Sequence, residues 1–552
     1  MDGIPQNAPG SITDGILVKE PLGRRIRVPA SVLASILLLV VPFWTFLHSH
    51  AHSPFTPSAL AIAVGLAAAG AAVGWWIHRT RSIVLRVLLM AALLLVSVDL
   101  IADIAGYHRL TAVVVLGATW ILRNHVARIA NAMAIAFGAG TLGFGEQAAD
   151  VVRRTETVEG AGNPPPLLHL IADEHIGIHG LPTDTEERVA LKHAITRFYV
   201  EHGFRLFTRA YSRYVFTADA LPNAFNFAES RRRQGWLGGL SANFPIRLGR
   251  NEYFERLAQL GYDLRVYQPT YMDFCAAQTA PASFCLTIPN NSLSHLAALN
   301  LDEWSSARYL AAFWITNESS LYSRIWDLYQ ERVRPALAAR KVPTLHWNWT
   351  RSDLAVVGGL RLLQRISHDV ETAPMLRGTA FFGHVQLTHS PYYLDEGCVP
   401  DFKINLRTET PWLTDQLVTP EQRHALYDEY LSQLGCWNSQ LDRLLAVFES
   451  RGASDAVVIV HGDHGSRIGT VPSRDSTLTK EQMADYYSTL FAIRAPGITP
   501  GVDTSVASIK DLLDRFSANG FKDEARASYP PPHVFLSPGT GNALRPVRAP
   551  PY

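Results

Sequence analysis

Acidic and imidazole side chains follow apolar runs at two distant places in the chain. One β-branched run ends shortly before Asp463-His464, and another apolar run ends directly before Asp173-Glu174. A buried strand that ends in such residues presents them at the carboxyl edge of an open α/β sheet, where ligands bind. Carboxylate oxygens and imidazole nitrogens ligate divalent metals. The two strand ends therefore predict a metal site, and the donor types admit zinc or manganese without choosing between them.

Asp173 and Glu174 taken alone have a simpler explanation as a solvated strand end, whereas Asp463-His464 is more specific, because a histidine is seldom placed at a strand end for solubility. Asp173 and Glu174 are neighbours and would point to opposite faces of an extended strand, but they can converge on one cation where the chain turns. Gly465 follows His464 and permits a sharp turn there. The two strand ends together favour the metal interpretation.

A hydroxyl nucleophile is expected near these ligands. Thr217 begins a segment that is typical of a helix, and the backbone N–H groups at a helix start favour anions. A threonine hydroxyl is a weak nucleophile until a metal lowers its pKa. The alternative is an ordinary helix-capping threonine. Ser212 is a nearby rival, although no helix start follows it.

A third segment ends in His389-Ser390-Pro391 and also contains His384. We expect it to be a strand that brings an imidazole to the same sheet edge. His389 is then placed to hold a phosphoryl oxygen or to protonate a leaving group, and His384 is a second candidate contact to the substrate. A lone histidine is usually structural, but this one lies in the chain between the two other strand ends, which favours a functional role.

Strands and helices alternate from Leu167 onward, which predicts the α/β class with a largely parallel sheet covered on both faces. The segment 145–166 is rich in Gly and Pro and is expected to be a linker, of which 147–158 lies along the membrane surface. The last, Pro-rich residues are expected to wrap the surface or to be disordered. The expected helices are 185–202, 254–261 and 422–451, and the expected strands include 262–267 and 490–493.

Residues 29–145 are mostly apolar, and about 20 apolar residues suffice to span a bilayer. The last two of five candidate spans are either one broken span or two short ones. Asp99 and Asp103 in the third candidate are expected to be exposed near the outer membrane boundary. The candidate spans are Pro29–Leu47, Ser58–Ile77, Ile83–Ala105, Leu110–Leu122 and Ala130–Gly145.

Basic residues cluster before the first span, between the second and third, and between the fourth and fifth. Five spans place all three clusters on the cytoplasmic side and the C-terminal domain outside, with Arg109 as the exception. Four spans would place that domain in the cytoplasm. We favour five. The expected order is a cytoplasmic tail (1–28), a transmembrane domain (29–145), a linker (146–166), a catalytic domain (167–527) and a C-terminal tail (528–552).

The four cysteines all lie in the C-terminal domain, which favours disulfides in an exported domain over free thiols in a cytosolic one. Their spacing allows the local pairs Cys275 with Cys285 and Cys398 with Cys436, but the sequence alone does not determine the connectivity. The formal net charge is +1, from 50 basic and 49 acidic residues. That balance, without a basic stripe, predicts no nucleic-acid partner.

The order of these motifs resembles the alkaline phosphatase and sulfatase superfamily over about residues 165–500. Its members share an α/β sandwich with a metal-activated nucleophile at the sheet edge. The sulfatase motif Cys-x-Pro-x-Arg is missing, because Cys398-Val399-Pro400-Asp401-Phe402 lacks the arginine. The membrane helices and the Thr-Ala-x-x-x-Pro spacing from Thr217 to Pro222 resemble bacterial phosphoethanolamine and phosphoglycerol transferases.

The resemblance implies a location and partners. The protein would be a multi-pass protein of the bacterial inner membrane with its catalytic domain facing the periplasm, a membrane lipid as partner, and a phospholipid or envelope glycan as substrate. The doublet Asp173-Glu174 departs from the single Glu of those transferases and is closer to sulfatases. The resemblance also implies that His389 contacts phosphate and that the metal ligands are Asp173 and/or Glu174, Thr217, Asp463 and His464.

Three hypotheses follow. The leading one is a membrane-anchored, metal-dependent phosphotransferase in which Thr217 attacks the phosphodiester of a phospholipid head group, transferring phosphoethanolamine or phosphoglycerol. The second is a phosphatase, phosphodiesterase or sulfatase-like hydrolase of the same fold. The third is a non-catalytic envelope protein that keeps the fold as a binding or assembly module.

Overall fold

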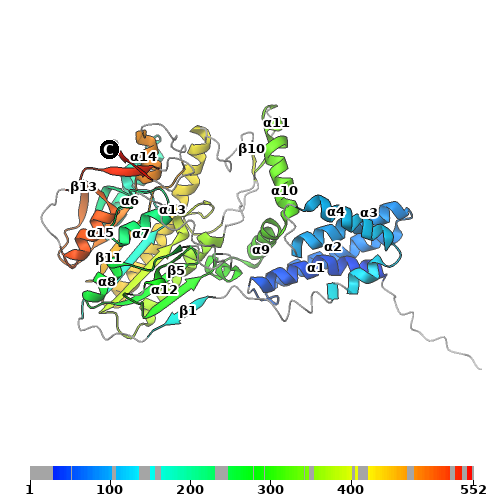
Figure 1. Ribbon diagram of the computed structural model, residues 1–552, viewed down its shortest axis with the longest axis horizontal. Coiled ribbons are helices and arrows are strands. Elements are labelled where there is room, and N and C mark those ends of the chain that lie inside the picture. The colour runs from blue at the N-terminus through cyan, green and yellow to red at the C-terminus, as the bar shows by residue number, and fades with distance from the viewer. Residues whose placement is uncertain are drawn as a thin grey trace, which may run out of the picture.

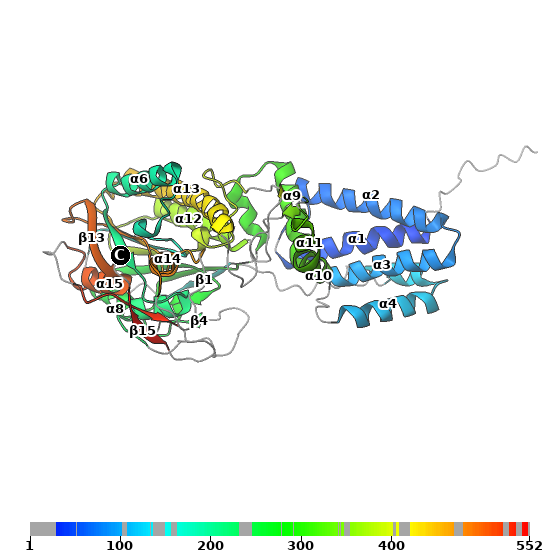
Figure 2. The ribbon, with the colours of Figure 1, turned by 90° about the horizontal axis from the view of Figure 1, so that it is seen from above.

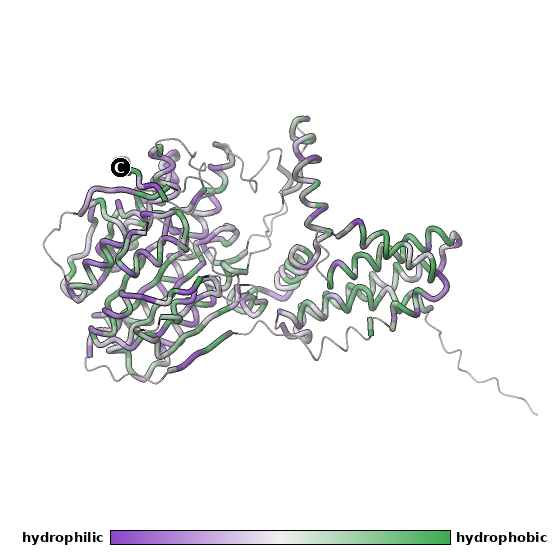
Figure 3. The backbone as a smooth tube through the Cα atoms, viewed as in Figure 1, coloured by the Kyte–Doolittle hydropathy of each residue, from purple (hydrophilic) through white to green (hydrophobic). Residues whose placement is uncertain are grey.

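Long apolar helices come first in the chain, and a mixed α/β domain follows them (Figure 1). The residues of the N-terminal helices are mostly hydrophobic, whereas the domain that follows mixes hydrophobic and hydrophilic residues (Figure 3). The expected fold class is confirmed. The structure is a computed structural model that describes residues 29–50, 52–101, 107–132, 134–135, 150–155, 163–230, 246–277, 279–290, 292–340, 342, 344–346, 354–400, 405–407, 420–468, 478–522, 529–536 and 544–549.

Three helices are long and apolar enough to cross a membrane: α1 (Ala30–Ser49), α2 (Pro57–Arg79) and α3 (Ile83–Ile101). Small residues let α2 approach α1 closely. A Cβ atom added to Gly70 or Gly74 would lie 2.7 or 2.5 Å from a Cα atom of α1. Small residues at such a contact favour helix association in lipid, where no hydrophobic force drives it.

The fourth helix, α4 (His108–Ile121), is followed by a bend of 119° and a second apolar helix, Val126–Ala132. This pair is a broken span or a re-entrant loop. The described residues therefore hold three spans, or four with this pair. Residues 136–149, which include most of the expected fifth span, and the tail 1–28 lie outside the described residues. The five-span topology stays a prediction.

The bundle has one end that faces the soluble domain. His50, after α1, lies 3.7 Å from the carboxylate of Glu318 in that domain. Since α1 and α2 are joined by a short loop and pack along each other, Arg79 at the end of α2 lies at the opposite end (Figure 1). Arg79 and, in the loop after α2, Arg81 thus lie at the end away from the soluble domain. The positive-inside rule assigns basic residues of this kind to the cytoplasmic side, and the side of the membrane on which the soluble domain lies stays a prediction.

Asp99 was expected to be exposed, and that prediction is wrong. Its side chain is buried, and it accepts hydrogen bonds from the hydroxyls of Ser319, at 2.6 Å, and Ser320 and from the N–H of Leu321. These groups belong to the start of a helix in the soluble domain, and a helix start supplies donors to a carboxylate. Asp103 lies outside the described residues.

The soluble domain is built on a nine-stranded sheet in the order β1-β7-β5-β9-β2-β11-β12-β3-β13. Seven strands are parallel to one another, and β1 and β12 are antiparallel to their neighbours. The strands are β1 (Val151–Arg154), β2 (Leu167–Ala172), β3 (Arg205–Tyr211), β5 (Asp263–Pro269), β7 (Phe284–Ile288), β9 (Thr379–Val385), β11 (Val457–His461), β12 (Phe491–Arg494) and β13 (Gly501–Ser508).

Helices cover both faces of this sheet (Figure 2). Along β11, Val458 and Val460 pack in the core of one face, and Val457 and Ile459 in the core of the other. A strand buried on both faces is apolar throughout, which explains its composition. One face carries α6 (Glu186–Glu201), α12 (Leu354–Thr372) and α13 (Pro420–Ser450), and the other carries α7 (Thr217–Phe225), α8 (Glu252–Gln259) and α15 (Ile509–Ala518).

The expected helices 185–202, 254–261 and 422–451 correspond to α6, α8 and α13, and the expected strands to β5 and β12. The remaining described helices and strands are shorter or peripheral. They are β4 (Ile246–Arg247), β6 (Met272–Asp273), α9 (Glu303–Glu318), α10 (Ser320–Leu328), α11 (Arg334–Ala338), β8 (Thr344–His346), β10 (Asn405–Arg407), α14 (Lys480–Tyr487), β14 (His533–Leu536) and β15 (Arg545–Arg548).

Two segments that were expected to lie outside the soluble domain form strands that are part of it. Val151–Arg154 was expected to lie on the membrane surface but forms β1, because its β-branched residues pair with the open edge of β7. The neighbouring residues 147–149 and 156–158 lie outside the described residues. In the C-terminal tail, β14 and β15 form a two-stranded sheet, and Val534 packs against Tyr211 and Tyr487.

Both local disulfide pairs that the spacing allows are present, Cys275 with Cys285 and Cys398 with Cys436. All four cysteines of the chain are thereby used. Paired cysteines agree with an oxidising compartment for the soluble domain.

This absence of free thiols makes membrane orientation testable by labelling. Phe55 lies in the loop between α1 and α2 and is 74% exposed, and Arg81 lies in the loop at the other end of α2. In sealed right-side-out vesicles, a membrane-impermeant maleimide should label Phe55→Cys, whereas Arg81→Cys should react only after permeabilisation. Equal labelling of Arg81→Cys in sealed vesicles would show that the orientation is inverted or mixed.

Candidate metal centre

Three adjacent parallel strands bring the site residues together. In the sheet, β2 lies between β9 and β11, so Asp173 after β2 meets Asp463 and His464 after β11. Gly462 makes the close approach possible, because a Cβ atom there would lie 2.4 Å from the hydroxyl of Thr489. The carboxyl edge of the sheet therefore assembles the group that the two apolar runs predicted.

Asp173, Asp463 and His464 form a cluster in which one candidate ligand atom from each lies within 4.8 Å of the others. All three side chains are buried. Asp173 Oδ1 and Asp463 Oδ2 have no hydrogen-bond donor among the described residues. Buried carboxylate oxygens normally have a partner, so these two are suited to a cation.

His464 adds a nitrogen lone pair to the cluster. Its Nδ1 lies 2.8 Å from the carbonyl oxygen of Gly465, to which only a protonated Nδ1 can donate. In the neutral ring Nε2 is therefore an acceptor. It lies 3.2 Å from Asp463 Oδ2, and two acceptors at that distance repel unless a proton or a cation lies between them. A backbone carbonyl that orients the ring in this way is typical of metal-binding histidine.

The two carboxylates of the cluster have shifted pKa values. Burial raises the pKa of Asp463, and the negative charge of Asp173 raises it further. Burial also acts to raise the pKa of Asp173, but the hydrogen bond from His384 and the charges of nearby histidines outweigh it and lower this pKa. A like charge beside a buried carboxylate is costly, and a divalent cation removes that cost. The residues fit a divalent metal ion.

Thr217 lies beside the cluster, as expected. It is the first residue of α7 and is buried, and its Oγ1 lies 3.2 Å from His464 Nε2. The hydroxyl is within hydrogen-bond reach of a basic nitrogen, and the positive end of α7 is beside it. This position suits a nucleophile that attacks an anionic group.

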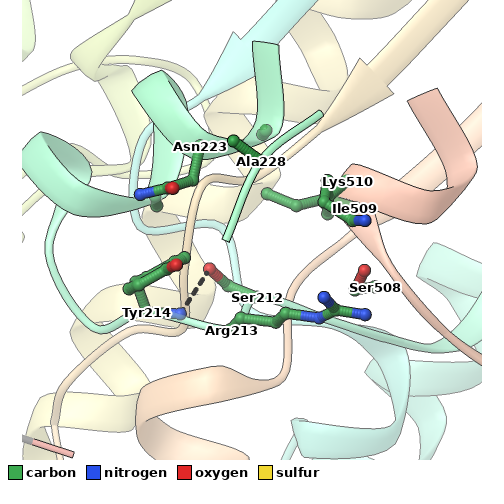
Figure 4. A pocket seen from close by; sticks show the side chains of 10 residues that line it. Ser212, Arg213, Tyr214, Asn223, Ala228, Ser508, Ile509 and Lys510 are labelled. Atoms are coloured by element: carbon green, nitrogen blue, oxygen red, sulfur yellow. Dashed lines mark hydrogen bonds between the residues drawn. The ribbon is translucent and has the colours of Figure 1, made fainter. Parts of the chain in front are cut away.

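Ser212, the rival nucleophile, is placed differently. Its Oγ accepts the N–H of Tyr214 at 3.3 Å. It lines a small pocket between the loop after β3, α7 and the start of α15, together with Arg213, Asn223 and Lys510 (Figure 4). No residue of the metal cluster lines this pocket.

Glu174 points away from the metal cluster. Its Oε1 forms an ion pair with Arg467 and lies 3.4 Å from His389 Nε2, and its Oε2 accepts the N–H of Ser390 at 2.9 Å. The backbone explains the divergence: Glu174 has a left-handed φ of 64°, so the carboxylates of Asp173 and Glu174 do not converge. Of the two expected acidic ligands, only Asp173 joins the cluster.

His389 and His384 also take different places. The His389 side chain is 28% exposed and lies beside Glu174, at the solvent side of the site. His384 is fully buried in β9, and its Nε2 lies 3.1 Å from Asp173 Oδ2. A buried imidazole bonded to a candidate ligand orients that ligand, so its geometry favours positioning over the expected substrate contact.

Two nearby residues were missed by the sequence analysis. Arg467 pairs with Glu174, is 26% exposed and also has a left-handed φ, of 57°. A basic residue shortly after Asp463-His464 is the signal that could have indicated it. Tyr271 follows β5, and its pKa is raised by burial and by the charges of Asp173, Asp463 and Asp219. No pattern in the sequence marks it.

No protein-family model and no curated protein sequence matches the chain. Among solved structures, it is similar to the C-terminal periplasmic domain of EcEptC from Escherichia coli in complex with Zn, with 14% identity over 71% of this chain and 95% of that chain and a TM-score of 0.37. It is also similar to the phosphonate monoester hydrolase of Agrobacterium radiobacter, with 11% identity over 68% of this chain and 82% of that chain and a TM-score of 0.37.

A putative sulfatase from Bacteroides thetaiotaomicron is a third similar structure, with 12% identity over 67% of this chain and 77% of that chain and a TM-score of 0.38. The likeness to these solved structures concerns the fold alone. Identities and TM-scores this low carry no argument about reaction, substrate or ligands, which have to come from the site itself.

The cluster predicts a stoichiometric metal ion. Purified protein should contain about one divalent ion per chain, and Asp173→Asn or Asp463→Asn should remove most of it, since each deletes an anionic ligand. Mass spectrometry of the metal content measures this. The matched control is Asp455→Asn, an acidic residue that pairs with Arg377 at the surface. Full metal content in both site variants would exclude this cluster as the metal site.

Removal of the metal should leave the charges of Asp173 and Asp463 to repel each other, which should make stability depend on pH. The pKa of Asp463 is raised in the folded chain, so the metal-free folded state binds more protons than the unfolded state above the ordinary Asp pKa. Stability should then fall as pH rises through that window. After chelation at neutral pH, Asp463→Asn should raise the free energy of unfolding by on the order of 1 kcal/mol relative to the unsubstituted protein, and thermal unfolding should show this as a higher midpoint temperature. A lower unfolding temperature contradicts this account.

Proposed function

We propose that this protein is a membrane-anchored, metal-dependent phosphotransferase that acts on the phosphodiester of a phospholipid head group, with Thr217 as the nucleophile. The observation that carries the proposal is the position of Thr217 Oγ1, 3.2 Å from His464 Nε2 and beside the buried pair Asp173 and Asp463. The bound metal would supply a lowered pKa for the hydroxyl and positive charge for the phosphoryl oxygens.

In the first half-reaction, the oxygen of Thr217 attacks phosphorus. The Oγ–P bond forms, the P–O bond to the diacylglycerol oxygen breaks, and Thr217 carries the head-group phosphate. The hydroxyl proton of Thr217 passes to solvent, and the diacylglycerol oxygen takes up a proton from His389 or from water as it departs, so the protons balance. An acceptor hydroxyl then attacks the same phosphorus, which releases Thr217 and regenerates its hydroxyl. Such two-step transfer divides one difficult displacement into two easier ones.

Two partly exposed basic side chains support the handling of a phosphodiester. Arg467 and His389 both contact the carboxylate of Glu174, which holds them at the solvent side of the cluster. A guanidinium binds phosphoryl oxygens in a bidentate manner, and an imidazole can protonate a leaving alkoxide. We assign Arg467 to binding the phosphoryl group and His389 to binding it or protonating the leaving group.

The membrane helices support a lipid donor. The soluble domain contacts the bundle directly through His50 with Glu318 and Asp99 with Ser319. A site carried by such a domain stays close to lipid head groups. An envelope glycan or a second lipid is the acceptor class that shares this location. We place the site on the periplasmic side of a bacterial inner membrane.

A hydrolase of the same fold is the second candidate. The exposure of His389 and Arg467 admits water to the side of the site where an acceptor would bind. Product analysis separates the two reactions, because transfer yields a modified lipid or glycan, whereas hydrolysis yields only the free head-group phosphate.

The nucleophile is tested on the full-length protein in lipid. Incubation with phosphatidylethanolamine or phosphatidylglycerol should add the mass of the head-group phosphate to the peptide that contains Thr217. Thr217→Ala should lose this adduct and at least about a thousandfold in kcat, while Thr217→Ser keeps a hydroxyl and part of the activity. Ser212→Ala is the matched control and should retain the adduct. Full turnover by Thr217→Ala would eliminate the mechanism.

A further inference from the structure

An arm of the soluble domain reaches onto the membrane helices. It consists of residues 303–338, with helices α9, α10 and α11, and lies in the chain between β7 and β8. Helix α9 packs against α2 and also contacts α1 and α3. Phe313 and Trp314 of α9 pack on Phe46 of α1 with ring centroids 6.0 and 6.5 Å apart. We call residues 303–338 the arm.

Asp99 joins the second part of the arm to the bundle. Its carboxylate lies at the start of α10, where it accepts the N–H of Leu321 at 3.0 Å and the hydroxyls of Ser319 and Ser320. The side chain is 1% exposed. A buried carboxylate in a membrane helix is costly unless it is fully bonded, and the donors at this helix start meet that need. The start of α10 is therefore held at the end of α3.

From this attachment, α10 and α11 run crosswise to α1, α2 and α3. Figure 1 shows them extending beyond the outline of the bundle, and Figure 2, turned by 90°, shows them nearly end-on. They lie at the end of the bundle that faces the soluble domain. With α1, α2 and α3 across a membrane, a helix that runs crosswise to them at this end is expected to lie parallel to the membrane surface, near the level of the head groups.

The composition of α10 and of the π-helical turn that continues it, Tyr329–Val333, fits that environment. Ile325 is 59% exposed, Leu328 50% and Val333 44%. Arg324 and Arg332 are exposed close to these apolar side chains. Apolar side chains beside arginines are the pattern of helices that lie in the membrane interface.

Aromatic rings add a second signature. Trp326 stacks on Tyr322 and Tyr329, with ring centroids 6.2 and 5.3 Å apart, along one side of the helix. Two loops at the same end of the bundle expose Phe55 and Tyr107, at 74% and 69%. Tryptophan and tyrosine gather at membrane–water interfaces, where their rings are apolar and their polar atoms reach water.

We propose that the arm is a lipid-binding element whose helices α10 and α11 lie in the outer interface of the membrane. Ile325, Leu328 and Val333 enter the boundary between head groups and acyl chains, and Arg324 and Arg332 contact lipid phosphates. Asp99 holds the arm at that level. This inference depends on the membrane helices and on the arm, and it is independent of the reaction at Thr217.

Lipid contact is measured with a fluorophore on the full-length protein in nanodiscs of phosphatidylethanolamine and phosphatidylglycerol. The native cysteines are paired, so a nitrobenzoxadiazole label attaches only at an introduced cysteine. The label at Ile325→Cys should show blue-shifted emission and lose most of its intensity when doxyl-labelled lipid is included. The matched control is Val502→Cys, which is 51% exposed in β13 and should show neither change.

Two outcomes would overturn the proposal. Equal behaviour of the labels at Ile325 and Val502 would place the arm in water. Protection of the Ile325 label from both doxyl lipid and aqueous iodide would show that protein covers it, such as a second copy of the chain.

Asp99→Asn tests the attachment of the arm. It should reduce the doxyl quenching of the Ile325 label, because one of the two accepting oxygens becomes a donor that faces other donors. The far-UV circular dichroism should stay unchanged, and so should the metal content, which reports on the soluble domain. Undiminished quenching in a folded Asp99→Asn protein would show that Asp99 does not hold the arm. Thr217→Ala should leave every quenching result unaltered, so a failure of the proposed reaction is distinguishable from a failure of this inference.

Discussion

The repulsion between two buried carboxylates is the constraint on which the candidate site depends. Asp173 and Asp463 lie at the ends of adjacent parallel strands, out of water, with one oxygen of each lacking a donor among the described residues. Nothing in the packing of the two strands requires acidic residues there, and the raised pKa of Asp463 shows what the placement costs. A divalent cation bound there would turn that cost into binding energy, and folding and metal binding would then stabilise each other.

The surrounding elements maintain this arrangement. β2 and β11 are buried on both faces, which holds their carboxyl ends in a rigid register. His384 from β9 orients Asp173, and the carbonyl of Gly465 orients His464. Such partners fix the orientation of the ligand side chains. The start of α7 then adds Thr217 on the third side, so that a hydroxyl, an imidazole and two carboxylates meet in one place.

A second buried carboxylate, Asp99, connects this domain to the membrane helices. Asp99 accepts hydrogen bonds from protein donors, whereas Asp173 and Asp463 are suited to a metal. The difference follows from the groups that face each carboxylate. The start of α10 offers N–H and hydroxyl groups to both oxygens of Asp99. At the ends of β2 and β11 the donors reach only Asp173 Oδ2 and Asp463 Oδ1, and the other oxygen of each carboxylate has no donor among the described residues. The same physical rule, that a buried charge has to be balanced, thus accounts for a structural joint in one place and a candidate metal site in the other.

Local pattern alone determined the fold class, the apolar helices, the main α/β elements and the residue types at the strand ends. The periodicity and composition of a segment are properties of that segment alone, so they predict its secondary structure without knowledge of its neighbours in the fold. Only the tertiary structure decided that Glu174 turns away from Asp173, that His384 supports a ligand, that Arg467 joins the site and that Asp99 is buried. Each of these depends on the neighbour that a side chain meets across the fold, and a single sequence carries no record of that neighbour. Glu174 and Arg467 show the reason most plainly: both have a left-handed backbone, and the partners of the Glu174 carboxylate, Arg467 and the N–H of Ser390, come from distant segments.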